Sequence, residues 1–185
     1  MKRLAITTTI WLALLGGGGA RRALCGAPCP PDGRAKAEES VRAASPSAAV
    51  ALPENVSLPE DLKPLLQEMW RRSPTFREQC RRIGEARHLR VKLSYAVPIL
   101  SSRFRALSVV NKREGQIDVT IKLVSSGDYF EMIAHEFEHV LEQLEGLDIS
   151  ALAEQRRDCA FRNELGFETQ RALEAGRRVR NEYLH

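Results

Sequence analysis

The stretch Tyr129–Glu145, YFEMIAHEFEHVLEQLE, has the clearest helical pattern in the chain. Its apolar residues recur at intervals of three and four, which is the period of a helix with one apolar face. Residues 125–128, Ser-Ser-Gly-Asp, supply loop and capping residues before it, and Gly146 is a natural stop after it. We therefore predict one helix over residues 129–145.

Two histidines lie one turn apart on this predicted helix. Each residue turns the helix by about 100°, so His135 and His139 point the same way, about 6 Å apart along the axis. The apolar face lies roughly opposite the pair, which favours a cleft over the core, and Glu136 lies between the two. Two imidazoles in this arrangement can hold one ion, and zinc prefers such nitrogen ligands.

A catalytic zinc site keeps three protein ligands and one water, whose pKa the metal lowers towards about 7. Glu136 is placed to take the proton of that water. The alternative is that two histidines occur by chance on a solvated helix face. The amphipathic helix directly after a strand favours the metal interpretation.

In the segments before this helix, apolar residues recur at every second position, which is the period of a strand and not of a helix. Apolar and polar residues alternate over 89–95 and again over 117–123, as in half-buried strands. A third strand is predicted from Arg105 to Lys112, followed by a short turn that contains Gly115. Three strands of this kind predict a small antiparallel sheet.

Helical patterns surround the predicted sheet. Residues 59–72 and 74–85 predict two helices, with Ser73 as the cap of the second. A less regular stretch, 147–166, precedes a final predicted helix over 167–184. The expected fold is therefore an α+β domain.

The N-terminus resembles an export signal. A basic start and an apolar run are followed by small residues up to Ala20, so residues 1–20 are interpreted as a cleaved signal peptide and the protein as secreted or periplasmic. A retained membrane anchor is the alternative; no later stretch is long and apolar enough to span a membrane. Residues 21–55 have almost no large apolar side chains and are expected to form a flexible linker or arm, which leaves 56–185 as the single folded domain.

Charge and cysteine content narrow the class of protein. The net charge of +4 falls to +2 once Lys2 and Arg3 leave with the signal, so nucleic acid is not implied as a partner. The four cysteines of an exported chain are compatible with two disulfides. We prefer Cys80 with Cys159 and Cys25 with Cys29, while Cys80 and Cys159 as buried thiols is an equally good interpretation.

The His-Glu-x-x-His helix resembles the active-site helix of the zincin metalloproteases. The metzincin branch would require Gly at position 142 and His at position 145, where this chain has glutamates. In the gluzincin branch a glutamate from a following helix is the third ligand. Glu168 matches the Glu-x-x-x-Ala pattern of small gluzincins, with Glu164 as the second choice and an ordinary helix N-terminal carboxylate as the alternative role of Glu168.

This resemblance implies zinc held by His135, His139 and Glu168, Glu136 as the general base, and a peptide or protein substrate. It also implies a zincin-like order of small sheet, metal helix and glutamate helix, with a strand at 105–112 or 117–123 able to bind an extended peptide. The alternative function is a secreted zinc-binding structural or interaction module without efficient catalysis.

No donor for a developing oxyanion is evident from the sequence. The residues considered for this role are Arg171, Tyr183 and His185, and His88 is interpreted as a surface residue. The acidic residues of the metal helix and the basic residues of the last helix are interpreted as solvated faces that pair with each other; they are Glu131, Glu138, Glu142 and Glu145, and Arg177, Arg178 and Arg180.

Overall fold

The structure is a computed structural model that describes residues 7–13, 52–96, 106–124, 128–155, 159–163 and 166–185. It confirms the predicted α+β class, with five α-helices, a five-stranded sheet and a separate two-stranded hairpin. Cys25, Cys29, Glu164, and all of the predicted arm before residue 52 lie outside the described residues.

The five-stranded sheet has the order β1-β4-β5-β3-β2. Its strands are β1 (Thr7–Ala13), β4 (Ala106–Arg113), β5 (Gln116–Leu123), β3 (Leu89–Tyr95) and β2 (Val56–Ser57). The three strands predicted from alternation are therefore confirmed within one residue at each end. They form the middle of the sheet.

The sheet is mixed, so the prediction of an antiparallel sheet is wrong. β4 pairs antiparallel with β1 and β5, whereas β3 pairs parallel with both β5 and β2. The cause is the position of β5. The β4–β5 hairpin, which turns at Gly115 with φ of 72°, places β5 between β4 and β3, and β5 then runs in the direction of β3.

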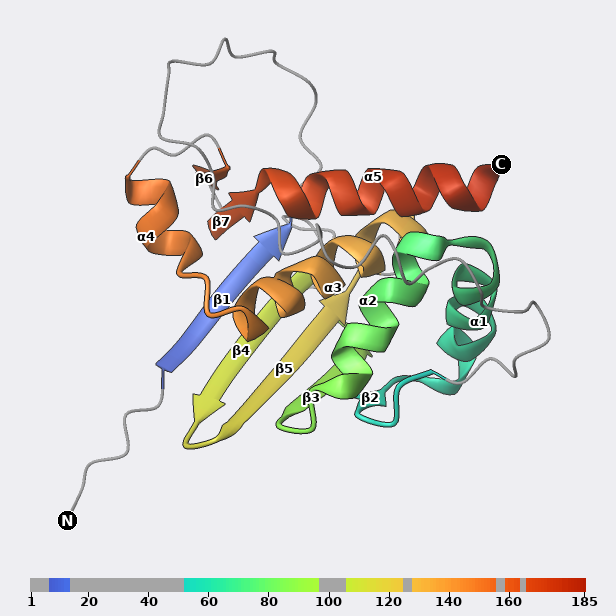
Figure 1. The fold of residues 1–185 in the computed structure, drawn as a ribbon, viewed down its shortest axis with the longest axis horizontal. Helices are drawn as coiled ribbons and strands as arrows, with labels where there is room; N and C mark the ends of the chain where they lie inside the picture. The colour runs from blue at the N-terminus through green and yellow to red at the C-terminus, as the bar shows by residue number, and fades with distance from the viewer. Residues whose placement is uncertain (1–6, 14–51, 97–105, 125–127, 156–158, 164–165) are drawn as a thin grey trace, which may run out of the picture.

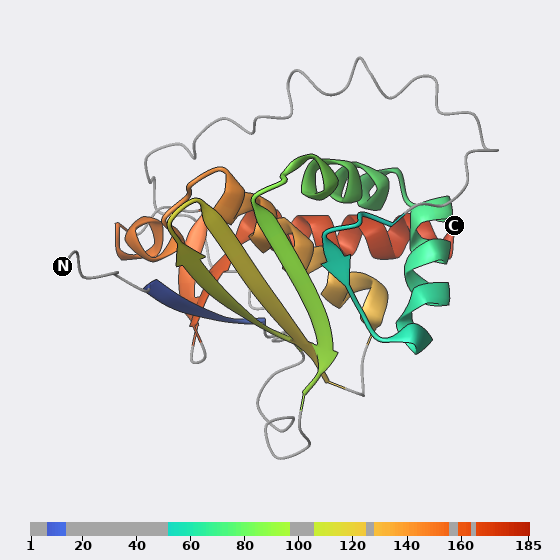
Figure 2. The same ribbon diagram turned by 90° about the horizontal axis from the view of Figure 1, so that it is seen from below.

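One face of the sheet forms the core. Alternate side chains of β3, β4 and β5 are buried on this face, among them Val91, Val110 and Ile121. Figure 2 shows the helices gathered on this side of the sheet. The other face presents polar side chains such as Arg90 and Lys92, both of which are exposed.

The first helices follow the sequence prediction closely. Residues 59–72 form a short 3-10 turn, η3 (Glu60–Leu62), and then α1 (Lys63–Arg72). The second predicted helix is α2 (Pro74–Glu85), and the Ser73 hydroxyl accepts a 2.9 Å hydrogen bond from the Phe76 amide as its cap.

α3 (Tyr129–Leu144) lies on the sheet, and α5 (Gln170–Leu184) packs closely against α3 (Figure 1). Gly176 of α5 makes this close approach possible, since a Cβ there would lie 2.8 Å from the Glu131 carbonyl oxygen. The other end of α5 is fixed on α2. The Glu182 carboxylate accepts hydrogen bonds from the hydroxyls of Ser73 and Thr75 and from the Thr75 amide.

The stretch 147–166 is more regular than the sequence predicts. It contains α4 (Ile149–Glu154) and the first strand of a hairpin, β6 (Ala160–Asn163), which pairs with β7 (Gly166–Thr169). The predicted final helix therefore starts three residues late, at Gln170. Thr169 caps it, because its hydroxyl accepts a 3.0 Å hydrogen bond from the Ala172 amide.

The preferred disulfide between Cys80 and Cys159 is wrong, because both are free thiols. Cys80 is buried in α2, and Cys159 is half-buried before β6. Burial raises the pKa of the Cys80 thiol to about 12. Within the described part of the chain, no helix combines the length and apolar character needed to cross a membrane.

Candidate metal centre

The helix that carries the two histidines is buried on every side. Residues 131–143 of α3 are all buried, so the predicted cleft on the histidine face is not observed. The wheel correctly set the histidines away from the apolar core face. It could not show that α5 and β7 cover the opposite face, since β7 starts 22 residues and α5 26 residues after the end of α3.

Three predicted ligand residues come together under this cover. Nitrogen and carboxylate oxygen atoms of His135, His139 and Glu168 all lie within 4.8 Å of one another, and each residue is at most 3% exposed. Glu168 Oε1 lies 3.1 Å from His139 Nε2, and Glu168 Oε2 lies 3.3 Å from His135 Nε2. The group could hold a metal ion.

Glu168 reaches the histidines from β7, not from a helix as the sequence predicts. It pairs with Phe161 in the β6–β7 hairpin and immediately precedes Thr169, the cap of α5. The Thr169 amide donates a 2.9 Å hydrogen bond to Glu168 Oε1. The junction between strand and helix therefore fixes the carboxylate.

Glu136 lies fully buried beside the histidines. The hydroxyl of Ser108, a buried residue of β4, donates a hydrogen bond to Glu136 Oε2. Burial raises the pKa of the Glu136 carboxyl, although His135, His139 and the Ser108 hydroxyl act in the opposite direction. The sequence analysis did not identify Ser108, because a single serine in an alternating strand carries no signal of its own.

Three buried polar atoms of the cluster lack hydrogen-bond partners. They are His135 Nε2, Glu136 Oε1 and Glu168 Oε2; the 3.3 Å approach of the first and third does not have hydrogen-bond geometry. Leaving a buried polar atom unpaired costs about 1–3 kcal/mol, more if it is charged. Two imidazoles and a carboxylate are also the nitrogen and oxygen donors that transition metals prefer. The residues present therefore fit a metal ion.

A third carboxylate, Glu142, contacts His139 on the other side of the ring. Glu142 Oε2 lies 2.7 Å from His139 Nδ1, and Glu142 Oε1 accepts a 2.7 Å hydrogen bond from the Thr169 hydroxyl. Glu142 is 1% exposed. The sequence analysis assigned it to a solvated face, which is wrong.

The carboxylates also change the protonation of the cluster. Burial on its own lowers the pKa of His139, but Glu142 and Glu168 outweigh burial and hold this pKa well above 6.5. Burial on its own raises the pKa of Glu168, but the neighbouring imidazoles of His135 and His139 outweigh it and lower the pKa to about 2. The carboxylates therefore favour the protonated form of His139, and the histidines favour the ionised form of Glu168.

Of the remaining acidic residues predicted to lie on a solvated face, Glu131 and Glu138 are buried, whereas Glu145 is exposed and paired, as predicted. Glu138 is fully buried and accepts hydrogen bonds from Gln79 and Arg171, while Arg171 also binds Glu145. Of the basic residues predicted to pair with this strip, Arg180 contacts it, with its guanidinium 3.8 Å from Glu131.

The residues considered as oxyanion donors make other contacts or lie elsewhere in the fold. The guanidinium of Arg171 is held by its two carboxylates, which raise its pKa although burial acts to lower it. Tyr183 stacks on Phe130, and His185 is exposed at the end of the chain. His88 is exposed before β3, as the sequence predicts.

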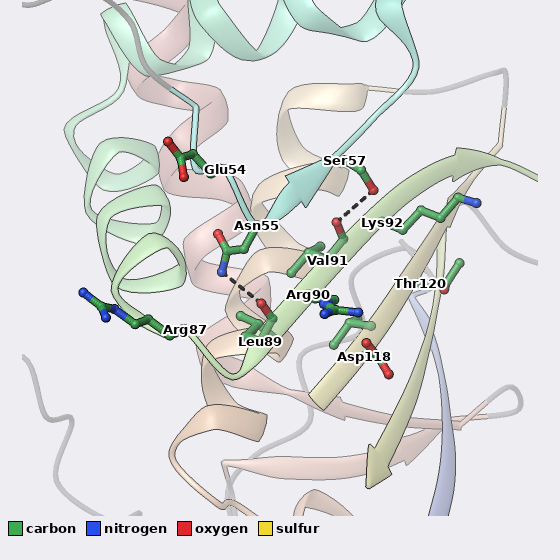
Figure 3. A pocket seen from close by; sticks show the side chains of 11 residues that line it. Glu54, Asn55, Ser57, Arg87, Leu89, Arg90, Val91, Lys92, Asp118 and Thr120 are labelled. Atoms are coloured by element: carbon green, nitrogen blue, oxygen red, sulfur yellow. Dashed lines mark hydrogen bonds between the residues drawn. The ribbon is translucent and has the colours of Figure 1, made fainter. Parts of the chain in front are cut away.

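A hollow of about 570 Å³ lies away from the cluster, where β2, β3 and β5 meet on the open side of the sheet (Figure 3). Arg90, Lys92 and Asp118 lie along it, and the side chains of Asn55 and Ser57 bind backbone carbonyls of β3 at its edge. Its polar lining belongs to the face opposite the histidines, so it takes no part in the candidate centre.

Comparison with known proteins assigns no family. The chain matches no protein-family model, and no curated protein or solved structure is significantly similar to it.

Proposed function

We propose that this protein is a zinc-dependent peptidase with a zincin-like arrangement, in which His135, His139 and Glu168 hold the metal and Glu136 is the general base. One observation carries the proposal. Three predicted ligands from two separate elements meet with their donor atoms within 4.8 Å. Two buried polar atoms of these ligands, and one of the neighbouring Glu136, have no hydrogen-bond partner.

The residues have distinct roles in this proposal. Zinc bound by the three ligands would supply a Lewis acid that polarises a substrate carbonyl and lowers the pKa of a water molecule. Glu136 would accept the proton on Oε1, which has no hydrogen-bond partner, while Ser108 holds Oε2 in place. The raised pKa of Glu136 suits a group that accepts a proton and then returns it.

β4 is the strand proposed to bind the extended peptide. β5 lies between β4 and β3 and has no open edge, which removes the second strand considered from the sequence. Ser108 of β4 contacts the proposed base, so a peptide paired along β4 would pass close to it. β1 takes that edge in the full chain, and it belongs to the segment interpreted as a signal peptide.

Metal analysis of the purified protein tests the proposal first. We expect one zinc per chain, lost in a His139→Asn variant and strongly reduced in Glu168→Gln. Glu164→Gln is the matched control for the third ligand. If zinc is retained in both glutamate variants, the gluzincin assignment is wrong, and if the wild type holds no metal, the whole proposal is wrong.

Peptide cleavage tests the catalytic part separately. We expect cleavage of members of a broad peptide library by the zinc-loaded protein. Glu136→Gln should keep the zinc and lose about 100-fold or more in kcat, the range of a general base. Export to the periplasm or the medium, with a new N-terminus near residue 21, is expected for the same protein.

A zinc-binding module without efficient catalysis is the second candidate. Burial favours it, because His135, His139, Glu136 and Glu168 are each at most 3% exposed in the full chain and the oxyanion candidates face elsewhere. A protein that binds one zinc, cleaves no library member and is unchanged by Glu136→Gln would have this function rather than the first.

A further inference from the structure

Glu142 connects the two sources of metal ligands. It lies one turn after His139 on α3, and its two carboxylate oxygens face different partners, His139 Nδ1 and the Thr169 hydroxyl, each at 2.7 Å. Thr169 follows Glu168 directly and caps α5. A single buried side chain therefore touches one ligand and the neighbour of another.

The contact with His139 fixes which ring nitrogen can bind a metal. A carboxylate accepts hydrogen bonds and cannot donate them, so a short contact with Glu142 requires the proton on Nδ1. Nε2 then faces Glu168 and is the nitrogen that can give up its proton to a metal. Metal-binding histidines commonly have such a partner, which fixes ring orientation and raises the basicity of the ligand.

The contact with Thr169 carries this orientation to the third ligand. The Thr169 amide binds Glu168 Oε1, and the Thr169 hydroxyl binds Glu142 Oε1. The chain Glu168, Thr169, Glu142 and His139 forms a closed ring of contacts, because Glu168 Oε1 lies 3.1 Å from His139 Nε2. A shift of β7 therefore changes the position of both ligands.

We propose that Glu142 is a positioning residue of the metal centre, which holds the Nδ1 proton of His139 and, through Thr169, keeps the β7 ligand Glu168 in register with α3. The inference rests on the metal site of the proposed function and does not depend on catalysis. With a metal bound, Glu142 and His139 would form a carboxylate, histidine and metal triad, which the Thr169 contact would connect to the second ligand, Glu168.

The test is the zinc affinity of the full chain, measured after metal removal by competition with a chromophoric chelator. Glu142→Ala should weaken zinc binding about 10- to 100-fold. Glu142→Gln keeps an acceptor for Nδ1 but loses the charge, so a smaller loss of about threefold is expected. Glu138→Gln is the matched control, since Glu138 is equally buried on the same helix with Gln79 and Arg171 as partners; it should leave the affinity unchanged.

A proton spectrum of zinc-loaded protein labelled with ¹⁵N at histidine gives a readout that a general loss of packing would not imitate. The slowly exchanging Nδ1 proton of His139 should be visible in the wild type and in Glu142→Gln, and lost in Glu142→Ala. If Glu142→Ala does not fold, Glu142→Gln and Thr169→Val carry the test. Thr169→Val should weaken zinc binding, and Thr169→Ser, which keeps the hydroxyl, should restore it.

The outcomes are distinct for the two proposals. A wild type that binds no zinc overturns the proposed function and this inference with it. A wild type that binds zinc, with the same affinity in the Glu142 and Thr169 variants, overturns only the inference. An equal loss in Glu138→Gln also overturns it, because any buried carboxylate of α3 would then have the same effect.

Discussion

Gly176 and His135 lie in direct contact across the two longest helices, since a Cβ on Gly176 would come within 3.3 Å of the His135 Cβ and 2.8 Å of the Glu131 carbonyl oxygen. The Glu131 carbonyl oxygen belongs to the backbone, so it cannot move aside as the end of a flexible side chain can. The approach of α5 to the candidate metal helix therefore depends on the absence of a side chain at this position.

Gly176→Ala is expected to destabilise the protein. Alanine in a helix interior normally stabilises the folded protein by about 0.5–1 kcal/mol relative to glycine. Here the clash with Glu131 should reverse the sign and cost about 1–3 kcal/mol, as overpacking does. Chemical denaturation of the wild type and the variant measures this difference in free energy of unfolding.

Gly84→Ala in α2 is the matched control. A Cβ there would meet the Pro53 side chain at 3.4 Å, which is ordinary van der Waals contact. This variant should be as stable as the wild type or more so. Equal effects of the two substitutions would show that Gly176 does not control the approach of the helices.

Ser108→Ala is expected to lower kcat and leave zinc affinity unchanged. The Ser108 hydroxyl donates to Glu136 Oε2, and its loss leaves a fully buried carboxylate with one partner fewer. Hydrogen bonds to charged groups contribute about 1.5–3 kcal/mol, so a loss of about tenfold or more in kcat is expected. Steady-state cleavage and chelator competition measure the two quantities. Ser94→Ala in β3 is the control, and an equal drop in both variants would contradict the role of Ser108.

Glu145 should make stability depend on acidic pH. Burial on its own raises its pKa, but Arg171 and Arg82 outweigh burial and lower the pKa below 4.5. A carboxylate with a lowered pKa in the folded state stabilises that state above the ordinary pKa, and the contribution disappears as pH falls through the lowered value. Glu145→Gln should therefore be less stable than the wild type at about pH 7, by no more than roughly 1 kcal/mol because solvent screens these partly exposed pairs. The difference should shrink as pH falls below the ordinary range of a glutamate carboxyl.

Urea denaturation at several pH values measures that difference. Glu60→Gln is the control, because the Glu60 side chain is 84% exposed and pairs only with Lys63 on the surface. A gap between wild type and Glu145→Gln that stays constant from neutral to acidic pH would rule out the ion pairs as its cause.

Removal of residues 1–20 should expose the β4 edge. β1 pairs with β4 over the register Thr7 with Lys112 to Ala13 with Ala106, and all seven of its residues fall within the predicted signal peptide. Hydrogen exchange of residues 106–112 should accelerate by about tenfold or more in a chain that starts at Arg21. β5 is the internal control, since it keeps both neighbours. Unchanged exchange in β4 would show that β1 does not protect it.

The sequence predicts the middle of the fold well because the signals there are local. Alternation and capping place β3, α2 and α3 within one residue, and Ser73 is confirmed as a cap. The sheet was predicted with the wrong strand directions, because strand order depends on contacts between distant segments that no local period records. The β6–β7 hairpin was missed for a related reason, since each strand is only four residues long.

The candidate site shows the same division. The spacing of His135 and His139 predicts their common direction, and the short pattern after Glu168 brought that residue into consideration. Glu142 was placed on a solvated face because a helical wheel shows only what a helix offers and not what covers it. Ser108 could not be found at all, because its role depends on a neighbour 28 residues away.

His139 and Glu168 are separated by 29 residues, and α4 and the β6–β7 hairpin fill that interval. An ion held by both residues would close this interval into a loop, as a covalent cross-link does. If it stayed bound on unfolding, it would also lower the conformational entropy of the unfolded chain. The ion would thus stabilise the C-terminal part of the domain as a cross-link. A chelator should loosen the interval between α3 and α5 while the sheet stays intact.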